Sequence, residues 1–269
     1  MIEFNDEEKK HFKEHGYVLF KNIFSDEQVE AIRAIVVKLA EWEHEQGNAF
    51  YYGENNQLRR VWNLINKHQV FRDIIQQASL LDIMEYLFDR NTIHQKYLLS
   101  SFQANIISAG GGAQKLHIDT PVPDPLPPWM IKVNTIWMLD DFTENNGSTE
   151  CLPGSHLFMR RPNAEEDQLR QDLMKVIAPK GSMLMIHGGL WHRSGQNQTD
   201  RDRIVLLGSF TASYTKEISN EEDHLQIIDQ EIIDNASPAL KKILAVGHGI
   251  KSGASQPPPL WSANDQIEI

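Results

Sequence analysis

Two histidines and one aspartate have the residue types and the spacing of a metal site. His117 and Asp119 are two positions apart, so in an extended segment their side chains point the same way. His192 follows 73 positions after Asp119, close behind an apolar stretch that ends at His187. Two imidazoles and one carboxylate on a β scaffold form a triad that holds iron(II) and leaves three positions open for a co-substrate and dioxygen. We therefore predict His117, Asp119 and His192 as metal ligands and as catalytic residues.

The distal histidine has an alternative, because His187 flanks the same turn as His192. His192 is favoured by two residues on its C-terminal side: Ser194 two positions later and Arg203 eleven positions later. His187 is then interpreted as a buried residue at the end of a strand.

Arg203 is the candidate anchor for an anionic co-substrate. It begins the predicted strand 203–210, in which Val205, Leu207 and Ser209 share its face, so its side chain should point into the fold. A guanidinium among apolar neighbours is costly unless it meets an anion. Its planar fork suits a carboxylate, such as the distal carboxylate of 2-oxoglutarate. The alternative is a salt bridge to a loop carboxylate.

The elements that must position these residues change in type along the chain. The first third carries helix signals: an acidic first turn and Gly16 for residues 5–15, a capping box at Ser25, and a stripe of apolar residues after Ser79. The middle has strand signals, with alternation in 131–139 and turn dipeptides between the segments. The predicted strands are 17–20, 97–107, 131–139, 182–187 and 203–210.

Short strands without intervening helices predict a mainly β fold, a jelly roll with helices packed outside it. We expect a single catalytic domain over residues 1–269. It would consist of a mostly helical N-terminal region (1–95), the jelly-roll core (96–212) and a helical tail with a surface C-terminus (213–269).

Charge and cysteine content narrow the class of protein. The 269 residues carry 26 basic and 37 acidic side chains, a net charge of −11, which argues against nucleic acid or an anionic membrane as a partner. One cysteine, Cys151, allows no disulfide within the chain and fits a cytoplasmic setting. The charged start lacks the apolar core of a signal peptide, and no apolar run is long enough to span a bilayer.

Five ordered motifs resemble the phytanoyl-CoA dioxygenase family of iron(II)/2-oxoglutarate oxygenases, whose fold is a double-stranded β-helix. They are the opening 12–20, the segment 114–119 around His117, the run 139–147 that ends in Asn-Asn-Gly, the Leu-Pro-Gly-Ser-His of 152–156, and 187–197 followed by Arg203. The resemblance covers most of the chain.

The resemblance implies iron(II), 2-oxoglutarate and dioxygen as cofactor and co-substrates. It places Arg203 and Ser194 on the distal carboxylate of 2-oxoglutarate, and it makes Thr149, Gln114 and Asn105 further candidates for binding the same molecule. Asp119 argues against halogenation, because halogenating members replace this carboxylate with a small residue. Family analogy also makes a homodimer a candidate.

Substrate contacts are predicted from aromatic residues near these motifs. Trp137 and Thr135 share one face of a strand expected to look inward, where Trp137 is either core or part of the substrate wall. The proline-rich segment 120–129, which ends at Trp129, leaves the metal ligand directly and is either a wall of the entrance or a plain crossover loop.

The predicted function is oxidation of a C–H bond of a small molecule, a natural product or metabolite, with release of succinate and carbon dioxide. The alternative is a metal-dependent jelly-roll enzyme of another kind, or a small-molecule sensor, that uses the same three ligands for a different divalent ion.

Overall fold

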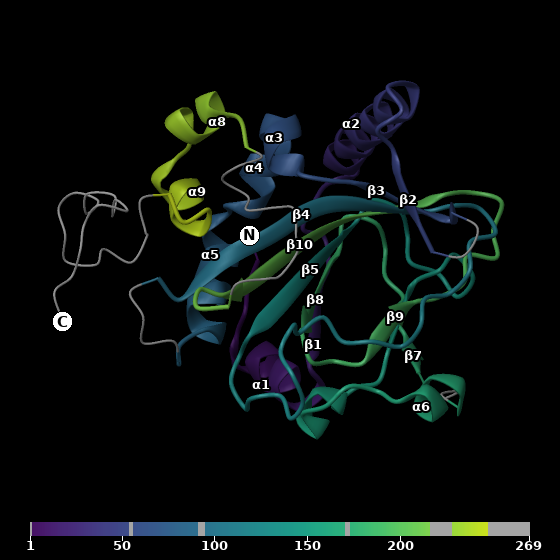
Figure 1. The fold of residues 1–269 in the computed structure, drawn as a ribbon, viewed down its shortest axis with the longest axis vertical. Coiled ribbons are helices and arrows are strands. Elements are labelled where there is room, and N and C mark those ends of the chain that lie inside the picture. Colours follow the sequence, from purple (N-terminus) through teal and green to yellow (C-terminus); the bar gives the residue numbers. More distant parts are fainter. Residues whose placement is uncertain (1, 54–55, 91–94, 170–172, 216–227, 247–269) are drawn as a thin grey trace, which may run out of the picture.

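The computed structural model describes residues 2–53, 56–90, 95–169, 173–215 and 228–246. Two antiparallel β-sheets form its centre (Figure 1). The larger sheet has the order β1-β8-β5-β10-β4-β3-β2, with β1 (Tyr17–Phe20), β2 (Phe50–Tyr52), β3 (Leu58–Val61), β4 (Tyr97–Ile107), β5 (Lys132–Met138), β8 (Met183–His187) and β10 (Arg203–Ala212). The smaller sheet has the order β7-β6-β9, with β6 (Thr149–Cys151), β7 (Met174–Lys175) and β9 (His192–Ser194). This arrangement agrees with the predicted jelly roll.

Helices cover one face of the larger sheet, and strands of the smaller sheet lie on its other side (Figure 1). The helices of the N-terminal region are α1 (Asp6–His15), α2 (Asp26–Glu45), α3 (Leu64–Lys67), α4 (Gln69–Ile75) and α5 (Ala78–Leu87). Later in the chain come the 3₁₀ helix η2 (Ser155–Phe158), α6 (Ala164–Leu169), α8 (Gln230–Asn235) and α9 (Pro238–Ile243). Every helix in the described part of the chain is too short or too polar to cross a membrane.

The first helices begin and end where their capping residues predict. The Asn5 side chain accepts hydrogen bonds from the backbone N–H groups of Glu7 and Glu8, and α1 stops at Gly16, whose φ of 79° suits glycine. Ser25 and Gln28 form the predicted capping box at the start of α2.

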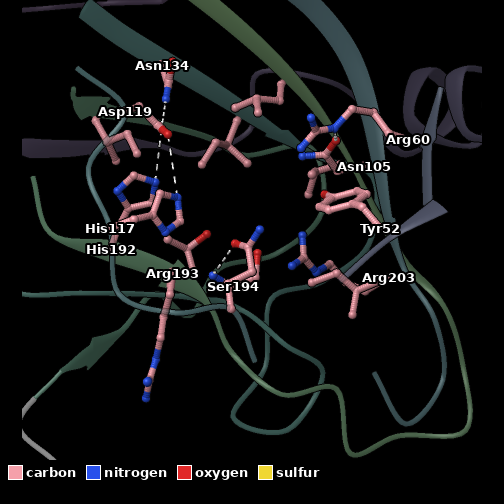
Figure 2. Close-up of a pocket in the computed structure, with 17 residues that line it drawn as sticks. Tyr52, Arg60, Asn105, His117, Asp119, Asn134, His192, Arg193, Ser194 and Arg203 are labelled. Atoms are coloured by element: carbon pink, nitrogen blue, oxygen red, sulfur yellow. Dashed lines mark hydrogen bonds and ion pairs between the residues drawn. The ribbon is translucent and has the colours of Figure 1, made fainter. Parts of the chain in front are cut away.

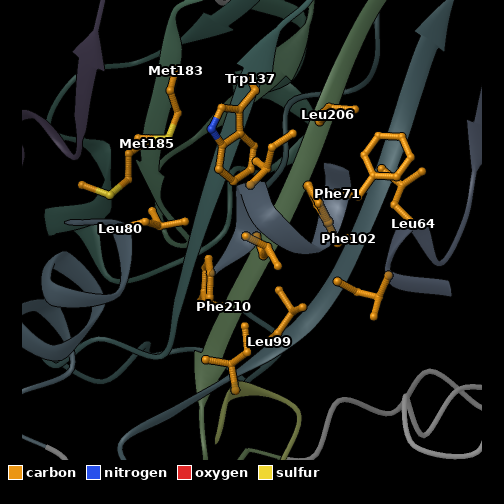
Figure 3. Packing of buried hydrophobic residues seen from close by; sticks show 14 of the residues in the cluster. Leu64, Phe71, Leu80, Leu99, Phe102, Trp137, Met183, Met185, Leu206 and Phe210 are labelled. Carbon is orange, nitrogen blue, oxygen red and sulfur yellow. The ribbon is translucent and has the colours of Figure 1, made fainter. Parts of the chain in front are cut away.

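The main hydrophobic core fills the space between the helices and the larger sheet (Figure 3). Trp137 of β5 is fully buried there, with its ring centroid 5.6 Å from that of Phe102 on β4. Phe71 of α4 packs edge-on against the same Phe102 at 6.2 Å. A second, smaller cluster lies on the other face of the sheet and includes Ile136 and Met138.

The two faces of β5 therefore differ in what they meet. Trp137 and Thr135 look toward the helices, and the Thr135 hydroxyl donates to the Gly208 carbonyl at 3.0 Å. Asn134 and Ile136 look toward the smaller sheet. The alternation was predicted correctly, and the face that carries Trp137 and Thr135 packs in the core against the helices, so it does not face the pocket.

Some elements differ from the prediction. In the N-terminal region, residues 1–95, the strands β2 and β3 were not predicted, and together with the predicted β1 they join the larger sheet. His117 and Asp119 belong to no named strand, although His117 forms an isolated β-bridge with His192. The expected tail is partly seen as α8 and α9, whereas 216–227 and the Gly/Ser/Pro stretch within 247–269 lie outside the described residues.

Candidate functional site

The three predicted metal ligands come together between the two sheets (Figure 2). His117 and His192 are tied by reciprocal backbone hydrogen bonds of 3.0 Å, one in each direction. The Asp119 N–H donates to the Gly188 carbonyl at 2.8 Å, which holds this residue beside the turn that leads to His192. Backbone pairing thus brings together ligands that are far apart in the sequence.

Both imidazoles present the same nitrogen to the carboxylate. Nδ1 of His117 is 2.8 Å from the Lys115 carbonyl, and Nδ1 of His192 is 2.9 Å from the Leu190 carbonyl. Since a carbonyl only accepts, each Nδ1 carries the proton and each Nε2 is left as a ligand atom. The Nε2 atoms lie 3.6 and 3.2 Å from the two Asp119 oxygens.

The charges of the three ligands are coupled. Burial opposes ionisation of Asp119, but the neighbouring His192 and His117 outweigh it and lower the pKa of this carboxyl group below its usual range. Burial would lower the pKa of His192, yet Asp119 raises it overall. Burial and His192 together lower the pKa of His117. The result is an ionised carboxylate facing two imidazoles, of which His192 is the one that holds a proton more firmly.

The donor set fits a divalent transition metal. One ligand atom from each of His117, Asp119 and His192 lies within 4.8 Å of the others. Two imidazole nitrogens and one carboxylate form the set used by non-haem iron(II) sites, which leaves the remaining positions to smaller ligands. Among the described residues, these three are the group of histidine, cysteine and acidic side chains that could hold such an ion.

A second layer of hydrogen bonds orients the carboxylate. The Asn134 amide of β5 donates to Asp119 Oδ2, and the Ser209 hydroxyl of β10 donates to Asn134 Oδ1 at 2.6 Å. Asn134 and Ser209 are 1% and 4% exposed, so water does not compete for these bonds. The larger sheet thereby fixes one oxygen of the metal ligand from behind. Sequence reasoning missed Asn134, although a polar residue inside an apolar strand was a signal.

The pocket extends from the triad to Arg203 (Figure 2). Arg203 is 3% exposed, and its Nη2 donates to the Gly147 carbonyl at 2.6 Å, while its buried Nε has no hydrogen-bond partner among the residues that the structure describes. Its guanidinium carbon lies 4.7 Å from the centroid of the Phe142 ring. Burial lowers the pKa of Arg203 to about 10, although Asp140 and Tyr52 act to raise it. A buried guanidinium with a free donor is a place for an anion.

Four other predicted co-substrate residues line the same pocket. They are Asn105, Gln114, Thr149 and Ser194. Ser194 of β9 is the strand partner of Thr149 on β6, and its N–H donates to Gln114 Oε1 at 3.0 Å. Asn105 approaches from β4 of the larger sheet, so the two sheets contribute opposite walls.

Three predicted substrate residues do not reach this pocket. Trp137 and Thr135 lie on the helix-facing side of β5, so Trp137 belongs to the core, the first of its two expected alternatives, and neither residue forms part of the pocket wall as predicted for the substrate site. Trp129 is 44% exposed and donates from its indole N–H to the Tyr214 hydroxyl at 2.7 Å. The proline-rich segment therefore ends at the surface.

His187, the alternative distal ligand, lies apart from the triad. Its ring centroid is 4.9 Å from that of His156, and its Nδ1 accepts from the Gly189 N–H at 2.9 Å. Burial and the nearby His156 lower the pKa of His187 to about 3. The structure brings His192 to His117 and Asp119, and the neutral His187 packs near the end of β8.

Tyr52, Arg60 and Arg193 also line the cavity. Sequence reasoning gave no role to Arg193. Arg193 is neutralised by Glu150, whose carboxylate is 2.7 Å from its Nε. Arg60 and Tyr52 come from β3 and β2, two short strands that carried too weak a pattern to be predicted.

Comparison with known proteins identifies relatives over most of the chain. A family model described as phytanoyl-CoA dioxygenase (PhyH) matches residues 12–205. Dioxygenase af480 of Aspergillus fumigatus is 28% identical over 249 residues, covering 90% of this chain and 77% of the relative. Dioxygenase sphC of the same species is 27% identical over 282 residues, covering 98% and 72%.

Two solved structures share the fold. The non-haem α-ketoglutarate-dependent carbocyclase SnoK from nogalamycin biosynthesis matches with a TM-score of 0.65 and 18% identity over 84% of this chain and 91% of that one. HygX from Streptomyces hygroscopicus, solved with nickel and 2-oxoglutarate bound, matches with a TM-score of 0.61 and 17% identity over 79% and 89%.

Proposed function

Because the chain belongs to the phytanoyl-CoA dioxygenase family, it is an iron(II)- and 2-oxoglutarate-dependent dioxygenase, and we propose that it oxidises a C–H bond of a small natural product or metabolite. The observation that carries the proposal is a pocket with the triad at one end and, at the other, Arg203, whose buried Nε makes no hydrogen bond within the described residues. This spacing of a metal site and a buried cation suits a co-substrate that has an acid group at each end.

Each residue has a defined task in this proposal. His117, Asp119 and His192 would hold iron(II), with both Nε2 atoms and one carboxylate oxygen as ligands. Arg203 would bind the distal carboxylate of 2-oxoglutarate, helped by the hydroxyls of Ser194 and Thr149. Bound iron(II) and 2-oxoglutarate supply the activation of dioxygen and the oxidising power, with succinate and carbon dioxide as products.

The protein contributes position and a restricted environment. Gln114 Oε1 accepts a hydrogen bond from the Ser194 backbone N–H, so the orientation of the Gln114 amide is fixed before any ligand binds. The Asn134 amide keeps the Asp119 carboxylate in one orientation. Preorganised donors of this kind lower the cost of placing the reacting groups.

A natural product is the substrate class that the relatives support best. SnoK acts in nogalamycin biosynthesis, and the family relatives named above are dioxygenases. The net charge of −11 disfavours large polyanions. A cytoplasmic location and a homodimer stay predictions.

The first test needs no substrate. Purified protein is loaded with iron(II) without air, 2-oxoglutarate is added, and the visible spectrum is recorded. A new metal-to-ligand charge-transfer band is expected, because the keto acid would chelate the metal beside the triad. Iron shown to be bound without such a band would contradict the proposal and favour a metal-dependent enzyme of another class.

A further inference from the structure

The two histidines of the candidate metal site make the same contact with the backbone. Nδ1 of His192 is 2.9 Å from the Leu190 carbonyl, and Nδ1 of His117 is 2.8 Å from the Lys115 carbonyl. Each carbonyl lies two residues before its histidine, so its peptide group ends in the N–H of the residue in between. Because a peptide group is planar and trans, whatever holds that N–H also sets the direction of the carbonyl on the opposite side.

A serine hydroxyl holds the N–H that lies before His192. The Trp191 N–H donates to Ser155 Oγ at 2.8 Å. Ser155 and Trp191 are both 0% exposed, so water does not compete for this hydrogen bond. One rigid peptide group therefore connects the Ser155 hydroxyl with the imidazole of His192.

The Ser155 hydroxyl takes the place of a strand carbonyl. The Leu152 N–H donates to the Trp191 carbonyl at 2.9 Å, which extends the pairing of β6 with β9 by one step. The Leu152 carbonyl accepts from the Ser155 N–H at 3.1 Å within the turn, and the Trp191 N–H uses the hydroxyl instead. The Gly154 N–H fixes this turn to the end of α1 by donating to the His15 carbonyl at 2.9 Å. The turn is the Leu-Pro-Gly-Ser-His motif of the sequence, and none of its residues lines the pocket.

A carboxylate holds the N–H that lies before His117. The Leu116 N–H donates to Asp167 Oδ1 at 2.7 Å. Asp167 belongs to α6, and Nη1 of Arg193 is 4.0 Å from the same oxygen. An ionised acceptor makes a stronger hydrogen bond than a hydroxyl, so we expect the larger effect at His117.

These hydrogen bonds affect both the direction and the basicity of the imidazoles. A bond accepted from the N–H polarises the peptide group and makes its carbonyl a better acceptor for Nδ1–H. A stronger bond at Nδ1 fixes the ring and makes Nε2 a better metal ligand. The Nε2 atoms of His192 and His117 face Asp119, 3.2 and 3.6 Å from its oxygens (Figure 2).

We propose that Ser155 and Asp167 are positioning residues for the metal site, and that each sets one histidine through the peptide group that precedes it. Neither residue lines the pocket. The consequence is that residues outside the pocket control the metal affinity, one histidine at a time. This inference rests on the proposed function, because it concerns the metal that the histidines would bind.

The test removes each acceptor separately and observes both histidines. Ser155→Ala and Asp167→Ala are compared with wild type and with two matched controls, Ser182→Ala and Glu165→Ala. Ser182 is also 0% exposed, and its hydroxyl makes no hydrogen bond within the described residues. Glu165 is an exposed acid on the same helix as Asp167. Iron(II) affinity is measured without air by competition with a chelator, and NMR of isotope-labelled histidine reports each imidazole in the metal-free protein.

Iron(II) affinity should fall about 5- to 10-fold in Ser155→Ala and about 10- to 30-fold in Asp167→Ala, near the lower end of the loss for an outer-shell partner, and stay within about twofold in both controls. Ser155→Ala should change the imidazole signals of His192 and leave those of His117, and Asp167→Ala should do the reverse. Asp167→Asn loses the charge but keeps an oxygen acceptor, so it should retain most of the affinity.

Either alanine variant, if it is folded and binds iron(II) within about twofold of wild type, overturns the inference. Equal changes at both imidazoles also overturn it, because a general loss of packing would not select one histidine. Asp167→Asn that binds iron(II) no better than Asp167→Ala would assign the effect to charge and remove this role from Asp167. Wild type that binds iron(II) but gives no charge-transfer band with 2-oxoglutarate contradicts the proposed function alone, so the two failures are distinguishable.

Discussion

Replacing Asn134 by leucine tests whether the larger sheet positions the metal ligand. Leucine is close to asparagine in size, but it removes the donor to Asp119 Oδ2 and the acceptor for the Ser209 hydroxyl. A hydrogen bond to a charged group contributes about 1.5–3 kcal/mol, and loss of an outer-shell partner typically weakens metal binding about 10- to 100-fold. Since Asn134 is 1% exposed, no water can take its place without a change in packing. We expect iron(II) affinity to fall about 10- to 100-fold.

The assay is a competition between the protein and a chelator of known affinity, followed without air for wild type, Asn134→Leu and Thr135→Val. Thr135 is the matched control, because it is the next residue on β5 and faces the helices, where its hydroxyl donates to Gly208. Thr135→Val should lower stability slightly and leave metal affinity unchanged. Folded Asn134→Leu protein that binds iron(II) within about threefold of wild type would refute this account of Asn134.

Four further outcomes are expected from the site and its surroundings. Arg203→Ala should weaken 2-oxoglutarate binding in calorimetry and leave iron(II) bound, and unchanged affinity would remove Arg203 from the co-substrate site. His192→Ala should abolish the charge-transfer band whereas His187→Ala keeps it; the reverse result would exchange the two assignments. Burial raises the pKa of Cys151 to about 12, so a thiol reagent should not label the native protein at pH 8 and should label it after unfolding. Burial and His156 lower the folded-state pKa of His187 to about 3, against 6.5 when unfolded, so the unfolded state binds more protons between these values. Unfolding free energy should therefore fall by about 1–2 kcal/mol from pH 6.5 to pH 5, less steeply in His187→Gln, and a slope equal to that of wild type would contradict this origin.

The three residues of the candidate metal site were predictable because short spacings in the sequence encode their chemistry. The spacing of two residues between His117 and Asp119 predicted a pair of metal ligands. The spacing of eleven residues between His192 and Arg203 predicted a binding site for a carboxylate. The structure brings the first three together, and it places Arg203 in the same pocket. Helix starts were equally accessible, since the capping boxes at Asn5 and Ser25 are local hydrogen-bond patterns.

The alternation of β5 alone could not predict which layer each of its two faces meets. A period of two shows that Trp137 and Thr135 share a face, but not which layer that face meets. In this fold the more apolar face packs against helices, and the polar pocket takes Asn134 from the other face. An apolar face is most stable where it is removed from water, and in this fold that place is the contact with the helical layer.

The strands β2 and β3 were missed for a different reason. Each has only three or four residues, and β3 contains two adjacent arginines. Such segments are strands because β4 offers them a hydrogen-bonding edge, which is a tertiary effect. The aromatic run Phe50–Tyr52 was the available signal, since aromatic residues are common in strands.

The strand order also governs when the protein can fold during its synthesis. In the larger sheet β4 pairs with β10, and β1 pairs with β8, so each pair joins segments separated by roughly a hundred residues or more. At ~5–20 residues per second, translation leaves β4 without β10 for roughly 5–20 seconds. Such long-range pairing predicts slow folding and an exposed apolar strand on the ribosome. Expression yield should therefore respond to temperature and to chaperones more than the stability of the finished protein would suggest.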